Sequence, residues 1–264
     1  MTTHALLKSL RANKPAFGAW LTVPGLFHAR TLANSSPHLS WIAVDCEHGL
    51  IPLVPGAAES VAAIESAGVS SLVRIPATGV TGSTSWQIKN ALDAGARGVI
   101  VPMVSSAEKA REVVADSKFP PNGRRGFGSP FTHGTWGTTM TQYLQTANDN
   151  VLVMVQIETK EAVENVQEIA QVEGIDVLFI GPYDLSISLG YPPPSPDPHA
   201  EVEEVIQKIL NASHAAQKKC AIYCTSGAQA AQRAAQGFDM INVTSDMGAM
   251  SEAVAANLNA AIKK

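Results

Sequence analysis

The sequence contains few cysteines, and their spacing indicates neither a metal site nor a disulfide framework. Only Cys46, Cys220 and Cys224 occur among 264 residues, and no two of them form a Cys-x-x-Cys pair. Structural zinc sites and small disulfide-stabilised domains need paired or evenly numbered cysteines. Reduced thiols in a cytoplasmic protein are therefore expected. Cys46 lies beside acidic residues, so a reactive thiol is an alternative at that position.

Charge is also scarce, at 16% of residues, and the formal net charge is only -4. Without a Lys/Arg cluster, the chain has no electrostatic pattern for binding nucleic acid. No apolar run approaches the roughly 20 residues that a membrane-spanning helix needs. The first residues, MTTHALLKSLRANKPAF, lack the apolar core of a secretory signal and predict an amphipathic helix instead. We therefore expect a cytoplasmic protein with neither a nucleic-acid nor a membrane partner.

Lysine is absent from the predicted strands, since all 11 lysines fall in predicted helices or loops. A Schiff-base aldolase built on a barrel would place its lysine on a strand facing the core, desolvated and with a lowered pKa. Lys160 comes closest, but it begins a predicted helix and should be solvated. Carbanion chemistry would therefore need a metal as its electron acceptor, and no organic cofactor is expected.

Short apolar runs alternate with longer helical patterns along the whole chain, and no linker splits it. The predicted strands are Phe17–Thr22, Trp41–Asp45, Ser71–Arg74, Gly98–Val101, Val151–Ile157, Val177–Ile180, Ala221–Tyr223 and Met240–Val243. The predicted helices include Val54–Ala67, Trp86–Ala94, Ala107–Ser117, Lys160–Ala170, Val202–Gln217, Gln229–Gln236 and Ser251–Ile262. Eight such units predict an α/β fold in one domain over residues 1–264, a (β/α)8 TIM barrel. A doubly wound open sheet is the alternative, but its usual glycine-rich first turn is missing from LTVPGLFHAR.

Two segments interrupt this rhythm, Phe119–Trp136 and Gly190–Ala200, and both are rich in proline or glycine. Long irregular inserts in a barrel are commonly lids or binding loops. Surface decoration is the alternative.

The stretch Val151–Ser186 predicts a strand, a crossover helix and a parallel strand. Glu158 follows the first of these strands and Asp184 follows the second. Both acids should therefore emerge at the carboxyl ends of neighbouring strands, where barrels bind ligands, and could bind a hard divalent cation. Alternatively, Glu158 occupies the first turn of the next helix and Asp184 caps a turn. Their matched positions favour the metal site.

Polar and aromatic residues follow the earlier strands as well. Trp20, Asp45, His48 and Arg74 should all lie at this same face of the barrel. His48 beside Asp45 suits a general base, because a carboxylate can orient an imidazole and raise its pKa; a plain surface histidine is the alternative. Arg74 ends a buried strand, so its charge needs either an anionic substrate or a salt bridge to Asp45 or Glu47.

The last two strands end in polar but chemically undirected segments, Tyr223–Ser226 and Thr244–Asp246. They lack the paired glycines of a phosphate cradle. The substrate is therefore not expected to be a sugar phosphate.

Six blocks of the sequence keep one register between about Leu7 and Ala261. They read DCEHG (45–49), VRIP (73–76), QIKNALDAGARGVIVPMV (87–104), PPNGRRGFGS (120–129), VQIET (155–159) and FIGPYDLS (179–186). Together they resemble the HpcH/HpaI aldolase family. The resemblance implies a metal-dependent class II pyruvate aldolase that acts on 2-keto-3-deoxy acids and dicarboxylic relatives such as 4-hydroxy-2-oxo-heptanedioate.

The resemblance also implies residue roles. Glu158 and Asp184 would bind Mg2+, Mn2+ or Co2+, with water and the pyruvate oxygens completing the shell. Arg74 would stabilise the developing enolate oxygen, and His48, oriented by Asp45, would act as the base at the aldol hydroxyl. The expected substrate contacts are Trp20, Gln156, Gly181, Pro182 and Tyr183.

An acid in the family's third helix matches Asp93, which would close over the site, from its own or a neighbouring subunit. The family commonly assembles as hexamers, trimers of dimers in which the last helix packs on a neighbour or is exchanged with it. Ser251–Ile262 is therefore the expected interface of a homo-oligomer. Tyr183 departs from the small residue usual in the family, and residues 130–136, which also differ, are expected to contact the aldehyde half of the substrate. The pyruvate half of the substrate is expected to be retained, while the aldehyde half stays open.

The expected reaction is reversible cleavage of a 4-hydroxy-2-oxo acid to pyruvate and an aldehyde. One alternative is a related lyase acting on a malyl- or citryl-type CoA ester. The lack of a basic cluster that could bind the CoA phosphates argues against it. The other is a barrel that binds a keto acid without turning it over. Against this counts the retention of Asp45, His48, Arg74, Glu158 and Asp184.

Overall fold

Parallel strands close into one barrel, in chain order from β1 to β8, in the computed structural model, which describes residues 3–76 and 84–262. The strands are β1 (Ala16–Leu21), β2 (Trp41–Asp45), β3 (Ser70–Arg74), β4 (Gly98–Val101), β5 (Leu152–Ile157), β6 (Val177–Ile180), β7 (Lys219–Ile222) and β8 (Met240–Ser245). The predicted (β/α)8 barrel is confirmed. Strands β2, β4 and β6 have the predicted bounds, because each is a short, fully buried apolar run.

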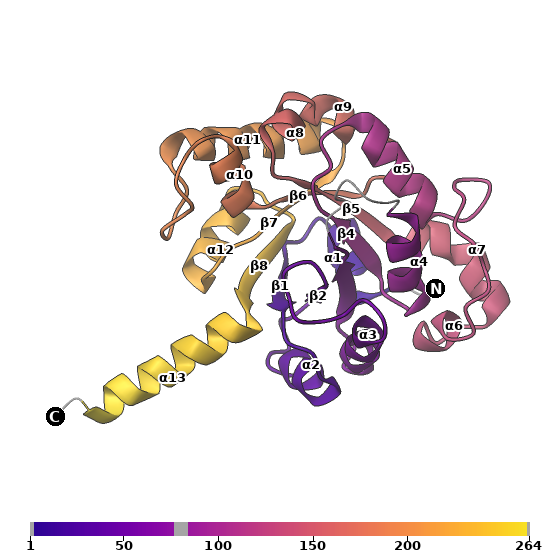
Figure 1. Cartoon of the computed structure of the whole chain (residues 1–264), viewed down its shortest axis with the longest axis horizontal. Helices are drawn as coiled ribbons and strands as arrows, with labels where there is room; N and C mark the ends of the chain where they lie inside the picture. The colour runs from indigo at the N-terminus through magenta and orange to yellow at the C-terminus, as the bar shows by residue number, and fades with distance from the viewer. Residues whose placement is uncertain (1–2, 77–83, 263–264) are drawn as a thin grey trace.

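Helices follow the strands and surround the barrel (Figure 1). They are α1 (Ala5–Arg11), α2 (Leu26–Ala33), α3 (Gly56–Ser66), α4 (Ser85–Asp93), α5 (Ala107–Ser117), α6 (Thr132–Thr135), α7 (Met140–Asn150), α8 (Lys160–Glu164), α9 (Val166–Ala170), α10 (Pro182–Ser188), α11 (Ala200–Ala215), α12 (Gly227–Ala235) and α13 (Asp246–Ile262). The predicted helix Lys160–Ala170 is interrupted at Asn165, whose side chain donates to Ser105 O at 2.9 Å. Within the described residues, none of these helices is long and apolar enough to cross a membrane.

Four of these helices, α2, α6, α7 and α10, were not among those predicted from the sequence. The segment of α10 was expected to be only the end of a strand. It becomes a helix because Pro182 occupies its first turn, where the missing N–H costs no hydrogen bond and φ is already helical.

The expectation that no lysine lies in a strand is wrong at one position, Lys219, the first residue of β7. Its ammonium group donates to Asn13 Oδ1 at 2.7 Å and to Asp239 Oδ1 at 2.9 Å. These contacts lie at the amino ends of the strands, away from the face that binds ligands in barrels. Lys219 is therefore a structural residue.

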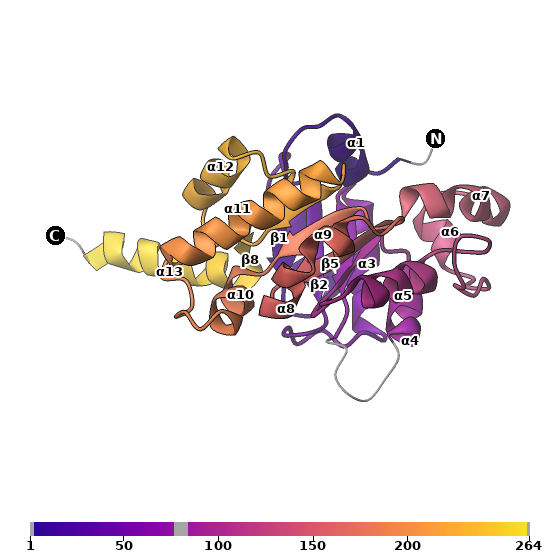
Figure 2. The ribbon, with the colours of Figure 1, turned by 90° about the horizontal axis from the view of Figure 1, so that it is seen from above.

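The interior of the barrel is filled by large side chains that include Trp41, Leu72, Ile100, Met154 and Phe179. Trp41 fits only because β1 carries Gly18 beside it, since a Cβ there would lie 2.1 Å from the indole ring. The leucines of α1 belong to the same cluster, so this helix closes the amino end of the barrel, opposite α10 (Figure 2).

His4 anchors α1 to this closed end. The ring is 9% exposed, with Nδ1 2.8 Å from Ser70 Oγ and Nε2 3.1 Å from Asn150 O. A carbonyl oxygen can only accept, so Nε2 donates and the neutral ring accepts at Nδ1. Burial lowers the pKa of His4 to about 3. The folded protein therefore needs the neutral imidazole.

We expect this histidine to make the protein acid-sensitive. Below about pH 6.5 the unfolded chain takes up a proton at His4 that the folded protein refuses down to about pH 3, so stability is full above this window and falls through it. The free energy of unfolding should drop by about 1.4 kcal/mol per pH unit. Urea denaturation between about pH 7 and pH 4.5 measures this, and His4→Gln should flatten the dependence. His38→Gln, at an exposed histidine, is the control; an equal slope in His4→Gln and the parent protein would contradict the assignment.

Candidate active site

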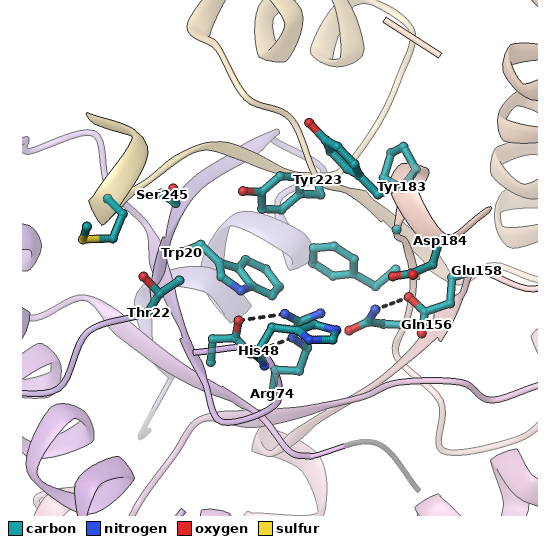
Figure 3. A pocket seen from close by; sticks show the side chains of 15 residues that line it. Trp20, Thr22, His48, Arg74, Gln156, Glu158, Tyr183, Asp184, Tyr223 and Ser245 are labelled. Carbon is teal, nitrogen blue, oxygen red and sulfur yellow. Dashed lines mark hydrogen bonds and ion pairs between the residues drawn. The ribbon is translucent and has the colours of Figure 1, made fainter. Parts of the chain in front are cut away.

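A cavity of about 320 Å³ opens at the carboxyl ends of the strands. It is lined by Trp20, Thr22, Asp45, His48, Arg74, Gln156, Glu158, Phe179, Gly181, Pro182, Tyr183, Asp184, Tyr223, Ser245 and Met247 (Figure 3). Every candidate residue from the sequence lies in this lining except Asp93. Among the described residues, no lysine lines it.

Glu158 is a buried acid of the cavity. It follows β5, is 2% exposed, and accepts a hydrogen bond from the backbone N–H of Met103 at 2.8 Å. Its other oxygen accepts from Gln156 Nε2. Gly181 leaves room for the Glu158 carboxylate, because a Cβ at position 181 would lie 2.7 Å from Glu158 Oε2. Burial, with repulsion from Asp184, raises the pKa of Glu158 to about 7. The residue therefore favours a positive partner.

Sequence reasoning missed the part played by Met103. Its φ of 58° is left-handed, which is uncommon for a residue with a side chain. This backbone conformation directs the N–H to Glu158. No residue type signals such a contact, because the donor belongs to the main chain.

Asp184 lies in the first turn of α10, directly after β6. The register pairs Ile157 of β5 with Ile180 of β6, so the residues that follow both strands emerge side by side. The sequence-based interpretation therefore holds for the placement of the two acids. The alternative for Asp184 was a residue that caps a turn; instead it lies in the first turn of a helix, because α10 starts immediately after the strand.

The donor set fits a hard divalent cation. No group of three or more His, Cys, Asp or Glu in residues 3–76 and 84–262 is arranged to hold a metal. Mg2+ commonly binds one or two carboxylates and takes its remaining oxygens from water and substrate, so Glu158 and Asp184 suffice. Gln156 Oε1 is buried without a hydrogen-bond partner among the described residues. Because buried polar atoms normally have partners, this oxygen is available for a ligand or its water.

Arg74 supplies the permanent cation. Its Nε and Nη2 donate to the two oxygens of Asp45 at 3.0 and 2.7 Å, and Nη1 lies 3.0 Å from Glu47 Oε2. The guanidinium carbon lies 5.0 Å from the centre of the Trp20 ring. Burial opposes the charge, but the two carboxylates outweigh it and raise the pKa of Arg74. The salt bridge weighed as the alternative therefore exists, and it also fixes the guanidinium at the cavity.

The expected orientation of His48 by Asp45 is corrected. The Asp45 carboxylate binds Arg74 and accepts the backbone N–H groups of Glu47 and His48, at 3.1 and 3.2 Å, but it does not bind the His48 imidazole. The imidazole is 68% exposed, with Nε2 3.8 Å from Glu47 Oε2. The sequence shows only that Asp45 and His48 lie in one short turn. It does not show that the Arg74 guanidinium, on the neighbouring strand, binds both carboxylate oxygens of Asp45. Asp45 orients Arg74, and His48 stands at the rim.

Asp93 does not reach the cavity of its own chain. It ends α4, where Arg125 Nη2 donates to it at 3.0 Å, and the next strand, β4, begins at Gly98. A helix that follows a barrel strand runs back toward the amino ends, so its last residue lies at the opposite face. The expectation that Asp93 closes over a neighbouring subunit's site stays a prediction.

The two irregular inserts also contribute no side chain to this cavity. Phe119–Trp136 packs instead around Arg125, which is 4% exposed and donates to Tyr143 Oη at 2.9 Å. The expectation that residues 130–136 contact the aldehyde half is therefore wrong within one chain. Cys46 is not a reactive thiol either, because burial raises its pKa to about 12.

An aromatic wall completes the cavity, formed by Trp20, Phe179, Tyr183 and Tyr223. Trp20 lies 5.5 Å from both Phe179 and Tyr223, centre to centre, and Tyr223 lies 6.4 Å from Tyr183. The Tyr183 and Tyr223 contact is edge-to-face, at 77°. Tyr223 could not be given a role from the sequence, where its position directly after β7 was the available signal.

The family model for HpcH/HpaI aldolase/citrate lyase matches residues 28–253. The chain belongs to this family. The hydroxypyruvate/pyruvate aldolase of Rhizorhabdus wittichii is 35% identical over 241 residues, which cover 91% of this chain and 92% of the relative. The 4-hydroxy-2-oxo-heptane-1,7-dioate aldolase of Shigella sonnei is 37% identical over 213 residues, 78% of this chain and 77% of the relative.

Among solved structures, a HpcH/HpaI aldolase/citrate lyase family protein from Burkholderia cenocepacia aligns with a TM-score of 0.88 at 31% identity. The alignment covers 99% of this chain and 100% of that protein. The family and its aldolase-named members indicate a carbon–carbon lyase.

Proposed function

We propose that this chain is a divalent-metal-dependent aldolase that reversibly cleaves a 4-hydroxy-2-oxo acid to pyruvate and an aldehyde. The observation that carries the proposal is the grouping of Glu158, Asp184 and the fixed Arg74 guanidinium around one cavity at the carboxyl face. The similarity to two aldolases whose names include pyruvate or a 4-hydroxy-2-oxo acid supports it.

Glu158 and Asp184 would hold Mg2+, Mn2+ or Co2+, which would supply electrophilic stabilisation to the 2-oxo group. Of the five N–H groups of Arg74, Asp45 and Glu47 use three, so within the described residues two remain for substrate oxygens. A guanidinium already oriented by Asp45 stabilises the negative oxygen that develops as the carbon–carbon bond breaks, at no cost in reorganisation.

The proton balance requires a base and an acid. The aldol hydroxyl gives its proton to His48, directly or through water, as the C3–C4 bond breaks and the aldehyde forms. The electron pair of that bond becomes the enolate of pyruvate, which takes up a proton at C3. The exposed imidazole suits this exchange with solvent.

A coupled assay of pyruvate release from several 4-hydroxy-2-oxo acids tests the proposal. Activity should appear with Mg2+ or Mn2+ and disappear with a chelator. Turnover that survives complete metal removal would reject the mechanism. Oxalate and metal binding without turnover of any of these acids would favour the non-catalytic keto-acid-binding barrel.

The CoA-ester lyase is the second candidate, since the family description includes citrate lyase. Arg74 is the only arginine in the described lining of the cavity, and it is held by two carboxylates. CoA phosphates would find no free cation there. Retention on a CoA resin would nevertheless support this candidate over the aldolase.

We further propose that α13 packs on a neighbouring subunit in a homo-oligomer, a hexamer built as a trimer of dimers. The helix extends away from the barrel, and all residues from Met250 to Ile262 are exposed (Figure 1). Met250, Val254 and Leu258 repeat every four residues, which places them on one face.

The three buried, free cysteines fit the expected cytoplasmic location.

The double variant Val254→Glu/Leu258→Glu is expected to lower the molar mass measured by light scattering, because two buried carboxylates would oppose the packing of α13. Asn257→Glu adds charge to the same helix without removing an apolar side chain, and it should retain the parent mass. A monomeric parent protein would contradict the proposed interface.

A further inference from the structure

The cavity has two chemically different sides (Figure 3). Glu158, Asp184, Gln156 and Arg74 lie on one side, where the pyruvate half would bind. Tyr183 and Tyr223 of the aromatic wall lie away from Arg74, with Tyr183 next to Asp184. The aldehyde half of a substrate would extend toward these two tyrosines.

The tyrosine side offers flat surface and neutral hydroxyl groups. Burial raises the pKa of Tyr223, whose hydroxyl is hydrogen-bonded to Ser245, so this phenol stays uncharged. Tyr183 is 41% exposed and forms the rim. Tyr183 precedes Asp184 in the first turn of α10, and both residues line the cavity. Aromatic rings at edge-to-face distances provide a platform on which another flat or apolar group can pack.

The charges of the cavity lining disfavour a substrate with a second carboxylate. The described lining contains three carboxylates, from Asp45, Glu158 and Asp184, which balance Arg74 together with one divalent cation. The carboxylate of the oxo acid then brings the site to a negative charge. In the described lining of the cavity, only His48 would remain as a partner for a further anion, and exposed ion pairs contribute about 0–1 kcal/mol. Residues 77–83, ATGVTGS, contain no basic residue.

We propose that the aldehyde half of the substrate is uncharged and carries an aryl or other flat apolar group that packs on Tyr183 and Tyr223, and that dicarboxylic substrates are selected against. This inference rests on the proposed aldolase function. It assigns to Tyr183, a bulky residue where the family usually has a small one, the choice of acceptor.

The test compares kcat/KM for 4-hydroxy-2-oxo-4-phenylbutanoate and 4-hydroxy-2-oxo-heptanedioate with the Mg2+-loaded protein. The parent should favour the phenyl substrate by about tenfold or more, the scale on which one apolar contact discriminates. Tyr183→Ala should lose most of this preference, and Tyr183→Phe should keep it. Ile187→Ala, on the same helix but outside the cavity lining, is the matched control and should also keep it.

Exchange of the pyruvate methyl protons in deuterated water, followed by NMR, distinguishes failure of the acceptor assignment from failure of the proposed aldolase function. Each variant's rates are normalised to its own exchange rate, which reports the pyruvate half without an acceptor. If exchange is intact, two results would overturn the acceptor assignment. One is an equal or reversed preference between the phenyl and the dicarboxylic substrate. The other is a preference for the phenyl substrate that Tyr183→Ala leaves unchanged. Absent exchange and absent cleavage would overturn the aldolase function, and the inference with it.

Discussion

Replacing Glu158 by glutamine is expected to lower kcat for cleavage of a 4-hydroxy-2-oxo acid by about a thousandfold, the loss of a full electrostatic contribution at the reacting centre. The amide keeps the shape of the side chain but removes the charge that a divalent cation requires. Binding of Mn2+, measured by calorimetry, should weaken in parallel. Because burial disfavours the ionised form of Glu158, the substitution should leave Tm equal or higher, which separates lost catalysis from lost folding.

Glu161→Gln is the matched control for this experiment. Glu161 lies in the first turn of α8, three residues further along the chain, and is exposed and outside the cavity lining. It should retain the parent kcat and Mn2+ affinity. If Glu158→Gln also retains both, Glu158 is not a metal ligand and the proposed mechanism fails.

Replacing Arg74 by alanine is expected to lower kcat/KM by about 10²–10³, because the positive group that faces the developing oxygen is lost. The change also leaves Asp45, which is 2% exposed, without its partner. Removing one member of a buried pair costs about 3–5 kcal/mol of stability. Activity must therefore be measured on protein shown to be folded, and added guanidinium should restore part of the rate.

Arg97→Ala provides a control for the structural part of this effect. Arg97 is 8% exposed and donates to Glu65 Oε2 at 2.7 Å, so it too belongs to a buried ion pair. It immediately precedes β4, at the amino face, far along the strand from the cavity. Arg97→Ala should lose stability but keep kcat/KM once folded. Equal losses of activity in both variants would show that Arg74 has only a structural role.

Much of the candidate site could be predicted because parallel strands impose an order on the residues that follow them. Arg74 and Asp45 are direct partners in the β2–β3 register, and Glu158 and Asp184 follow neighbouring strands. Because the sequence repeats a strand followed by a helix, the residues that follow the strands could be placed at the same face of the barrel. The resemblance did not show that Asp93 lies away from the cavity of its own chain, because its block of sequence similarity continues through a helix that runs back to the opposite face.

The sequence by itself determined the barrel and the two acids beside one arginine, because these depend on hydrophobic periodicity and on position along the chain. Only the tertiary structure decided that Asp45 holds Arg74 rather than His48, and that Tyr183 and Tyr223 meet across the ends of β6 and β7. Such contacts join residues distant in sequence. Their partners are chosen by distance and geometry after the barrel has closed, which no local pattern records.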